Sequence, residues 1–216
     1  MIAPEGKIIL LPLIIIVLTT TGIVVYSEST GVFLKWFNII IWIFVLFSLY
    51  FFRDPNRISK GQVNQMVSPA DGKVVQIIEI NDPDLGLSKQ ISIFLSVFNV
   101  HCQRVPISGK VISSNYNAGK FLAAFNHKAS MDNEQTSIIF QTSDGHKYKV
   151  KQIAGLIARR ILNYMKPDMI VEKGERLGFI RFGSRVDIIV PLDFKINVDL
   201  GESVQGNLSI IGEFIK

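Results

Sequence analysis

The side chains of this sequence best suited to chemistry lie in three short motifs. Gly183-Ser184 is the only Gly-Ser pair, and it lies in GERLGFIRFGSRVDIIVP between two segments rich in β-branched residues. A serine hydroxyl becomes a nucleophile when a base lies nearby, and the preceding glycine leaves its own carbonyl open to attack. On local sequence alone an ordinary turn also explains this pair.

Two other polar residues lie beside expected strands. His101, in ISIFLSVFNVHCQRVPISG, titrates at about pH 6.5 when unperturbed, so it could act as an acid or a base. Asp71 lies in SPADGKV. Each has a simpler interpretation, because a hydrogen-bonded histidine can end a strand and Asp-Gly after Pro-Ala is typical of a turn.

The composition excludes several other kinds of site. The single cysteine, Cys102, rules out a disulfide scaffold and a multi-cysteine metal site. His101, His127 and His146 are the only histidines and form no HxH or HExxH pair, so no metal is expected. Neither GxGxxG nor GxxxxGK[ST] occurs, and no basic run with interleaved aromatic residues indicates nucleic acid.

The elements that would position these side chains follow residue 53, where short β-branched runs alternate with Gly, Pro, Asn and Asp. This pattern predicts a mainly β (α+β) fold, a sandwich or barrel-like domain over residues 53–216. One helix is expected over Leu156–Tyr164, ended by Pro167. The expected strands are Lys73–Ile80, Gln90–Phe98, Lys110–Ser113, Thr136–Gln141, Lys147–Ile153, Arg176–Phe182, Val186–Val190, Lys195–Val198 and Asn207–Ile210.

The N-terminal region, residues 1–52, has a different character. Residues 8–26 and 37–52 are two apolar, uncharged runs, and a helix needs roughly 20 residues to cross a bilayer. We expect a two-helix membrane hairpin, with Lys35 and Trp36 at an interface. The alternative is a signal peptide followed by a core helix, but TTTGIVVYSES is a poor cleavage site.

The charges indicate how such a hairpin would be oriented. Lys7 precedes the first run, and Arg53, Arg57 and Lys60 follow the second, which predicts both ends on the cytoplasmic side. Residues 1–52 carry no net charge, so the formal charge of +5 belongs to residues 53–216. A basic domain beside a membrane suits anionic lipid headgroups.

Read together, the motifs resemble the phosphatidylserine decarboxylases, in the short bacterial and archaeal form. The resemblance covers essentially the whole chain, in six blocks that occur in order. The blocks are FFRDPNR (51–57), SPADGKV (68–74), FLSVFNVHCQRVP (94–106), FNHKASMDNEQ (125–135), QIAGLIARRI (152–161) and GERLGFIRFGSRVDIIVP (174–191).

The resemblance implies a self-processing enzyme. Ser184 would attack the Gly183 carbonyl, and the chain would separate into a β chain of residues 1–183 and an α chain of residues 184–216 that stay together. Ser184 would become a covalent pyruvoyl group, the only cofactor, which forms a Schiff base with phosphatidylserine. His101 would act as base or acid and Asp71 would orient it. Arg181 and Arg185 would meet the lipid phosphate or carboxylate.

Two departures and several alternatives accompany this resemblance. The processing site is Phe-Gly-Ser-Arg where longer members have Leu-Gly-Ser-Thr, and Arg104 stands where they have a second histidine, so the steps that use His101 stay open.

Archaetidylserine, an ether lipid with the same headgroup, is an alternative substrate. A membrane-anchored, lipoyl-like adaptor without catalysis is the alternative from another class. The lack of an HxH pair argues against a metallopeptidase, and the lack of GxSxG argues against a serine hydrolase. The oligomeric state also stays open.

Overall fold

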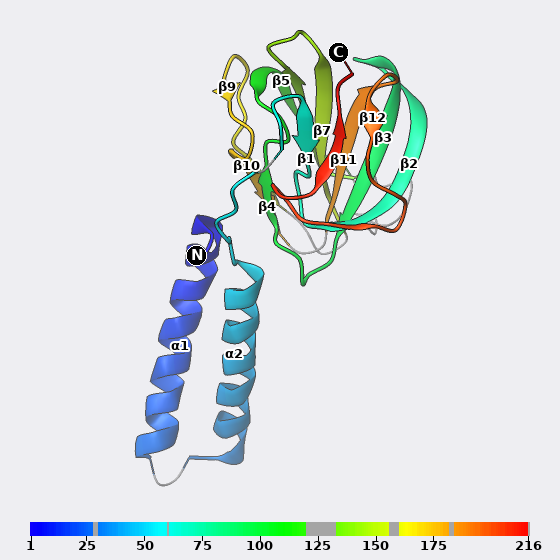
Figure 1. The fold of residues 1–216 in the computed structure, drawn as a ribbon. Coiled ribbons are helices and arrows are strands. Elements are labelled where there is room, and N and C mark those ends of the chain that lie inside the picture. The colour runs from blue at the N-terminus through cyan, green and yellow to red at the C-terminus, as the bar shows by residue number, and fades with distance from the viewer. Residues whose placement is uncertain (28–29, 60, 120–132, 156–159, 182–183, 216) are drawn as a thin grey trace. The chain divides into compact units, whose positions relative to one another are not determined.

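The chain is described by a computed structural model that covers residues 1–27, 30–59, 61–119, 133–155, 160–181 and 184–215. It divides into two compact units, Met1–Asn56 and Arg57–Lys216. The first is helical and the second is built of strands (Figure 1). The mainly β fold behind two N-terminal apolar helices is thus confirmed.

The first unit is an antiparallel pair of helices. A short 3-10 helix, η1 (Pro4–Gly6), leads into α1 (Lys7–Tyr26), and α2 (Val32–Phe51) returns beside it (Figure 1). The spans Pro4–Tyr26 and Val32–Phe51 are both long and apolar enough to cross a membrane. The second helix begins at Val32 and not at the expected residue 37, because the extended Gly31 before it allows the helix to start there.

Polar side chains tie the two helices together. The Asn38 amide of α2 donates to the hydroxyls of Thr20 (2.8 Å) and Thr21 (2.9 Å) of α1, and Trp42 Nε1 donates to Thr21 (3.0 Å). At the other end, Gly6 lies so close to Phe52 that a Cβ atom would come within 2.6 Å of its ring. Hydrogen bonds between polar side chains are a common source of helix pairing in lipid.

The second unit contains three antiparallel sheets. The largest has eight strands in the order β13-β2-β3-β11-β7-β6-β5-β9, and its curl is visible in Figure 1. Two sheets of three strands, β1-β14-β12 and β4-β10-β8, complete the unit. The strands are β1 (Gln65–Val67), β2 (Gly72–Asp82), β3 (Gly86–Leu95), β4 (Cys102–Arg104), β5 (Gly109–Asn117), β6 (Gln135–Gln141), β7 (Lys147–Ala154), β8 (Ile161–Asn163), β9 (Ile170–Val171), β10 (Arg176–Ile180), β11 (Ser184–Pro191), β12 (Lys195–Ile196), β13 (Ser203–Val204) and β14 (Ile210–Glu213).

The hydrophobic core lies against one face of the eight-stranded sheet. Side chains alternate between the faces of a strand, so Val186, Ile188 and Val190 of β11 share the core face. Core residues from the two small sheets, such as Met66 and Leu177, belong to the same cluster. The central strand β11 is buried along nearly its whole length, between β3 and β7.

The opposite face of this sheet holds buried charges. Lys149 of β7 forms ion pairs with Asp82, at the end of β2, and with Asp84 (2.6 Å) in the turn that follows. Since β11 and β3 lie between β7 and β2 in the sheet, these pairs join strands that are not neighbours. These ion pairs thereby hold the β2–β3 turn to β7.

Three sequence expectations need correction. Ile161–Asn163 was expected to be helical but forms β8, because it pairs with β10; residues 156–159 of that expected helix lie outside the described residues. The strand expected to reach Phe98 ends at Leu95, where a turn held by Ser96 and Asn99 begins. The last strand begins at Ile210, because Asn207 has a positive φ of 64° within the preceding turn.

Candidate active site

Ser184 is the first residue of the central strand β11. It lies opposite Leu95 of β3 and Ala154 of β7. Its parity with Val186 places its side chain on the core face, and it is fully buried. Its Oγ atom has no hydrogen-bond partner within the described part of the chain. A buried hydroxyl without a partner is uncommon and requires an explanation, and a reactive role is one. Gly183 and Phe182 lie outside the described residues.

His101 is buried just before β4, and its tautomer follows from one contact. Its Nδ1 atom lies 2.9 Å from the backbone carbonyl oxygen of Asn99. A carbonyl oxygen only accepts hydrogen bonds, so in the neutral ring Nδ1 carries the proton and Nε2 carries the lone pair. Asn99 is itself fixed, since its Oδ1 accepts from the backbone N–H (2.8 Å) and the hydroxyl (2.7 Å) of Ser96. In the neutral ring of His101, Nε2 is therefore the nitrogen that can accept a proton.

Two buried glutamines connect His101 to the sheet that carries Ser184. Gln103 Nε2 donates to the His101 carbonyl oxygen (2.7 Å), and Gln152 Nε2 on β7 donates to Gln103 Oε1 (3.1 Å). Both glutamines are fully buried. Gly178 makes room for this contact, because a Cβ atom there would come within 2.5 Å of Gln152 Nε2. The chain of amides therefore links the histidine to the strand beside β11.

The backbone also brings His101 to the end of the sheet where Ser184 lies. The N–H of Ile180, the last residue of β10, donates to the His101 carbonyl oxygen (3.4 Å). Ser184 follows Ile180 by four residues, and four residues span at most about 14 Å. The structure thus places the expected base and the expected nucleophile in the same region.

Asp71 lies at the same end of the sheet, just before β2, but its contacts are different from those expected. Its carboxylate forms a two-pronged ion pair with Arg57 (Nη2 to Oδ2 3.0 Å) and accepts from the backbone N–H of Gly206 (2.8 Å). Within the described residues, the structure does not bring Asp71 into contact with His101. Arg57 was therefore missed as a site residue, although it ends the block FFRDPNR in the sequence.

The two arginines beside the expected cleavage site lie in different environments. Arg185 is fully buried on the sheet face opposite to Ser184. It donates to Asp187 (2.6 Å), Ser92 (2.6 Å) and Gln76 (2.8 Å), an arrangement that favours a structural role over lipid binding. Arg181 is half-buried beyond β10, and its Nε atom has no hydrogen-bond partner among the residues that the structure describes. Arg181 therefore differs from Arg185, whose guanidinium is fixed by three side chains.

Ser184 and His101 supply a hydroxyl and an imidazole at this end of the sheet. Among the described residues, no three His, Cys, Asp or Glu side chains gather closely enough to hold a metal ion. Ser184 and His101 are instead a hydroxyl and a base, the pair that nucleophilic attack requires.

Comparison with known proteins identifies relatives of this chain. The family model described as Phosphatidylserine decarboxylase matches residues 44–212. The "Phosphatidylserine decarboxylase proenzyme" of Syntrophus aciditrophicus is 43% identical over 216 residues, which cover 99% of this chain and 97% of the relative. Proteins of the same description from Ralstonia pickettii (45% over 173 residues; 80% of each chain) and Chlorobium chlorochromatii (46% over 175 residues; 80% and 81%) are similar to most of it.

Proposed function

Because the chain belongs to the phosphatidylserine decarboxylase family, we propose that it converts phosphatidylserine to phosphatidylethanolamine and carbon dioxide after cutting its own backbone between Gly183 and Ser184. The observation that carries this proposal is the buried Ser184 Oγ, which has no hydrogen-bond partner in the described chain and lies in the region of His101. The description of its relatives as proenzymes supports synthesis as a precursor.

Self-cleavage would begin at these two residues. His101 Nε2 takes the proton from Ser184 Oγ, and the oxygen attacks the carbonyl carbon of Gly183. The peptide C–N bond breaks, and His101 returns the proton to the nitrogen of Ser184, which becomes a free amine. An ester between the Gly183 carbonyl carbon and Ser184 Oγ then joins the two residues. Glycine suits the attacked position because it has no side chain to shield the carbonyl.

The ester would then open by elimination. A base takes the α-proton of residue 184 and the bond between its Cβ and Oγ breaks, so residues 1–183 leave with a new carboxylate and residue 184 becomes dehydroalanine. Water replaces the nitrogen, which departs as ammonia, and a pyruvoyl group caps the remaining 33 residues. That group supplies a ketone that takes up the substrate amine and accepts the electrons released with carbon dioxide.

The described side chains would serve the second reaction as well. His101 is the residue best placed to return a proton to the substrate carbon, because its nitrogen is a buried acid–base group at this end of the sheet. Arg181 would bind the lipid phosphate through its guanidinium. Asp71 is assigned a positioning role, since the Arg57–Asp71–Gly206 contacts fix the chain that enters β2.

The two apolar helices support an attachment to the cell membrane. Each is long enough to span it, and the basic flanks favour a cytoplasmic position for the second unit. The net positive charge of residues 53–216 suits an anionic lipid surface. Archaetidylserine carries the same headgroup, so the proposed chemistry would apply to it unchanged.

A decarboxylase assay tests this proposal. The full chain in detergent should release carbon dioxide from phosphatidylserine, whereas Ser184→Ala should release none above background. A matched control, Ser143→Ala, changes an exposed serine in the turn between β6 and β7 and should keep full activity. No activity of the wild-type chain on phosphatidylserine would reject the proposed function.

A further inference from the structure

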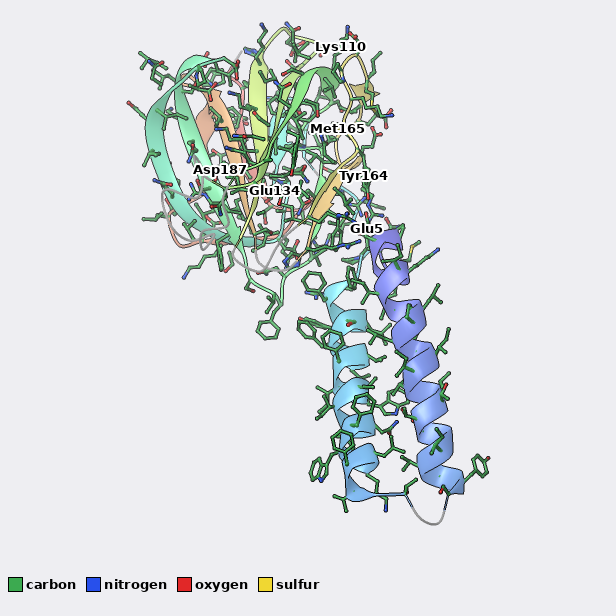
Figure 2. The ribbon with its side chains drawn as sticks, turned by 180° about the vertical axis from the view of Figure 1, so that it is seen from behind. Glu5, Lys110, Glu134, Tyr164, Met165 and Asp187 are labelled. Carbon is green, nitrogen blue, oxygen red and sulfur yellow. The ribbon has the colours of Figure 1, made fainter. Side chains whose placement is uncertain are left out.

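Glu134 lies in the same cross-strand row as Ser184. Ser184 is opposite Ala154 of β7, and the Ala154 N–H donates to the Glu134 carbonyl oxygen (2.9 Å), continuing the register by which Gln135 pairs with Ile153. Residues opposite each other share a face, so Ser184, Ala154 and Glu134 all face the core side. Glu134 is labelled in Figure 2, among the strands of the second unit.

Among the described residues, no cationic side chain pairs with the carboxylate of Glu134. Its side chain is buried, with a relative exposure of 5% for the residue. Within the described chain its hydrogen-bond partner is the hydroxyl of Tyr116 (3.0 Å), a neutral donor, and no lysine or arginine pairs with it. This hydrogen bond raises the pKa of Tyr116 above its usual value. A buried carboxylate that is bonded to a neutral donor gains when a cation binds beside it.

We propose that Glu134 binds the primary ammonium group of the lipid headgroup and so selects amine-bearing lipids. This inference rests on the proposed function. The α-carbons of Ser184 and Glu134 are two strand spacings apart, about 10 Å. A glutamate side chain and one hydrogen bond of about 2.9 Å cover much of that distance. Ala154, which lies between them in the row, has a side chain of a single methyl group.

The charge of the headgroup supports this assignment. A serine headgroup carries one ammonium, one carboxylate and one phosphate, and only the ammonium is attracted to a carboxylate. The ammonium is also the group whose nitrogen must reach residue 184. Glu134 would hold it beside that residue, while Arg181 binds one of the anionic groups. FNHKASMDNEQ, the block that ends with Glu134 and Gln135, thereby gains a chemical role.

The test compares two inhibitors of the full-length, processed protein in detergent micelles that contain phosphatidylserine. Phosphatidylethanolamine carries the ammonium, and phosphatidylglycerol does not. Glu134→Gln should cut itself as the wild type does, and should weaken inhibition by phosphatidylethanolamine about tenfold or more, as expected for loss of a charge-assisted hydrogen bond. Inhibition by phosphatidylglycerol should stay within about twofold, because that lipid lacks the group bound.

Controls separate this inference from its alternatives. Tyr116→Phe keeps the carboxylate of Glu134 and should weaken inhibition by phosphatidylethanolamine far less than Glu134→Gln does. Glu172→Gln changes an exposed glutamate beside β9 and should leave inhibition by both lipids unchanged. Two outcomes would overturn the inference but not the proposed decarboxylase function. In one, Glu134→Gln leaves inhibition by phosphatidylethanolamine unchanged. In the other, it weakens inhibition by both lipids equally. Failure of Glu134→Gln to cut itself, with Glu134→Asp cutting normally, would also overturn it, since the carboxylate would then act before substrate binds. An inactive wild-type chain would instead reject the proposed function.

Discussion

The guanidinium of Arg57 binds the carboxylate of Asp71 with two hydrogen bonds, and both side chains are largely buried. Removal of the arginine leaves a carboxylate in a mostly dry site with the Gly206 N–H as its remaining donor. We expect Arg57→Ala to lower the free energy of unfolding by about 3 kcal/mol. Self-cleavage should also slow, because the chain that enters β2 at the Ser184 end would lose its anchor. Chemical denaturation in detergent measures the first effect, and gel analysis of the cut chains measures the second.

A control for that experiment uses a solvent-exposed ion pair. Lys110 and Asp168 are 2.7 Å apart and both are well exposed. Lys110→Ala should therefore change the free energy of unfolding by about 0.5 kcal/mol or less and leave cleavage unchanged. If Arg57→Ala behaves like Lys110→Ala, the Arg57–Asp71 pair has no role in the site.

The Gln152–Gln103 link to His101 predicts a non-additive effect on cleavage. Gln152→Leu removes the donor that holds Gln103, so His101 should lose its alignment and cleavage should slow about tenfold or more. In a His101→Ala background the same change should slow the residual cleavage no further, because there is no base left to align. The test compares the cleavage rates of the wild type, Gln152→Leu, His101→Ala and the double variant.

Two outcomes would contradict this positioning role. One is equal slowing by Gln152→Leu with and without His101, which would mean that the glutamine acts through general stability. The other is unchanged cleavage. Gln141→Leu, at the far end of β6, is the matched control and should cut at the wild-type rate.

The ion pairs of Lys149 predict a pH-dependent contribution to stability. Burial alone raises the pKa of Asp82, but the hydrogen bonds from Lys149 and from the backbone N–H groups of Asp84 and Leu85 outweigh it, so the pKa lies below its ordinary value. A lowered folded pKa stabilises the protein above the unfolded pKa of about 3.9, and this stabilisation is lost as the pH falls through the folded pKa. The ion pairs should therefore matter most near neutral pH.

We expect Lys149→Met to lower the free energy of unfolding by about 3 kcal/mol at pH 7, since it leaves Asp82 buried and unpaired. The deficit should shrink toward pH 4, because the variant can protonate its unpaired Asp82 there, and it should shrink further below the lowered pKa of Asp82 in the wild type, where the ion pair is lost. Denaturation curves at several pH values test this. A deficit that stays constant with pH would show that Asp82 does not titrate as described.

Much of the fold could be predicted because it rests on local pattern. The apolar runs of the first unit are long enough for membrane helices, and the β-branched run VDIIV indicated the buried strand β11. Ile161–Asn163 could not be placed this way, because its residues suit a helix and only pairing with β10 makes it a strand. A short stretch of sequence does not show pairing with a strand that lies elsewhere in the chain.

The sequence motifs indicated candidate site residues but not the contacts of those residues. Gly183-Ser184, His101 and Asp71 were recognisable by motif, yet the partner of Asp71 is Arg57, 14 residues earlier in the chain. The opposite faces of Ser184 and Arg185 could have been anticipated, because adjacent strand residues always point to opposite sides. The row that joins Ser184, Ala154 and Glu134 depends on strand order, which the sequence alone does not provide.

The intact mass of the purified protein tests the central claim most directly. We predict two chains, residues 1–183 and a fragment of 33 residues whose first residue is a pyruvoyl group and therefore resists Edman degradation. Ser184→Ala should give one uncut chain of 216 residues. A wild-type protein that remains a single chain of full mass, or that is cut at another bond, would contradict the account.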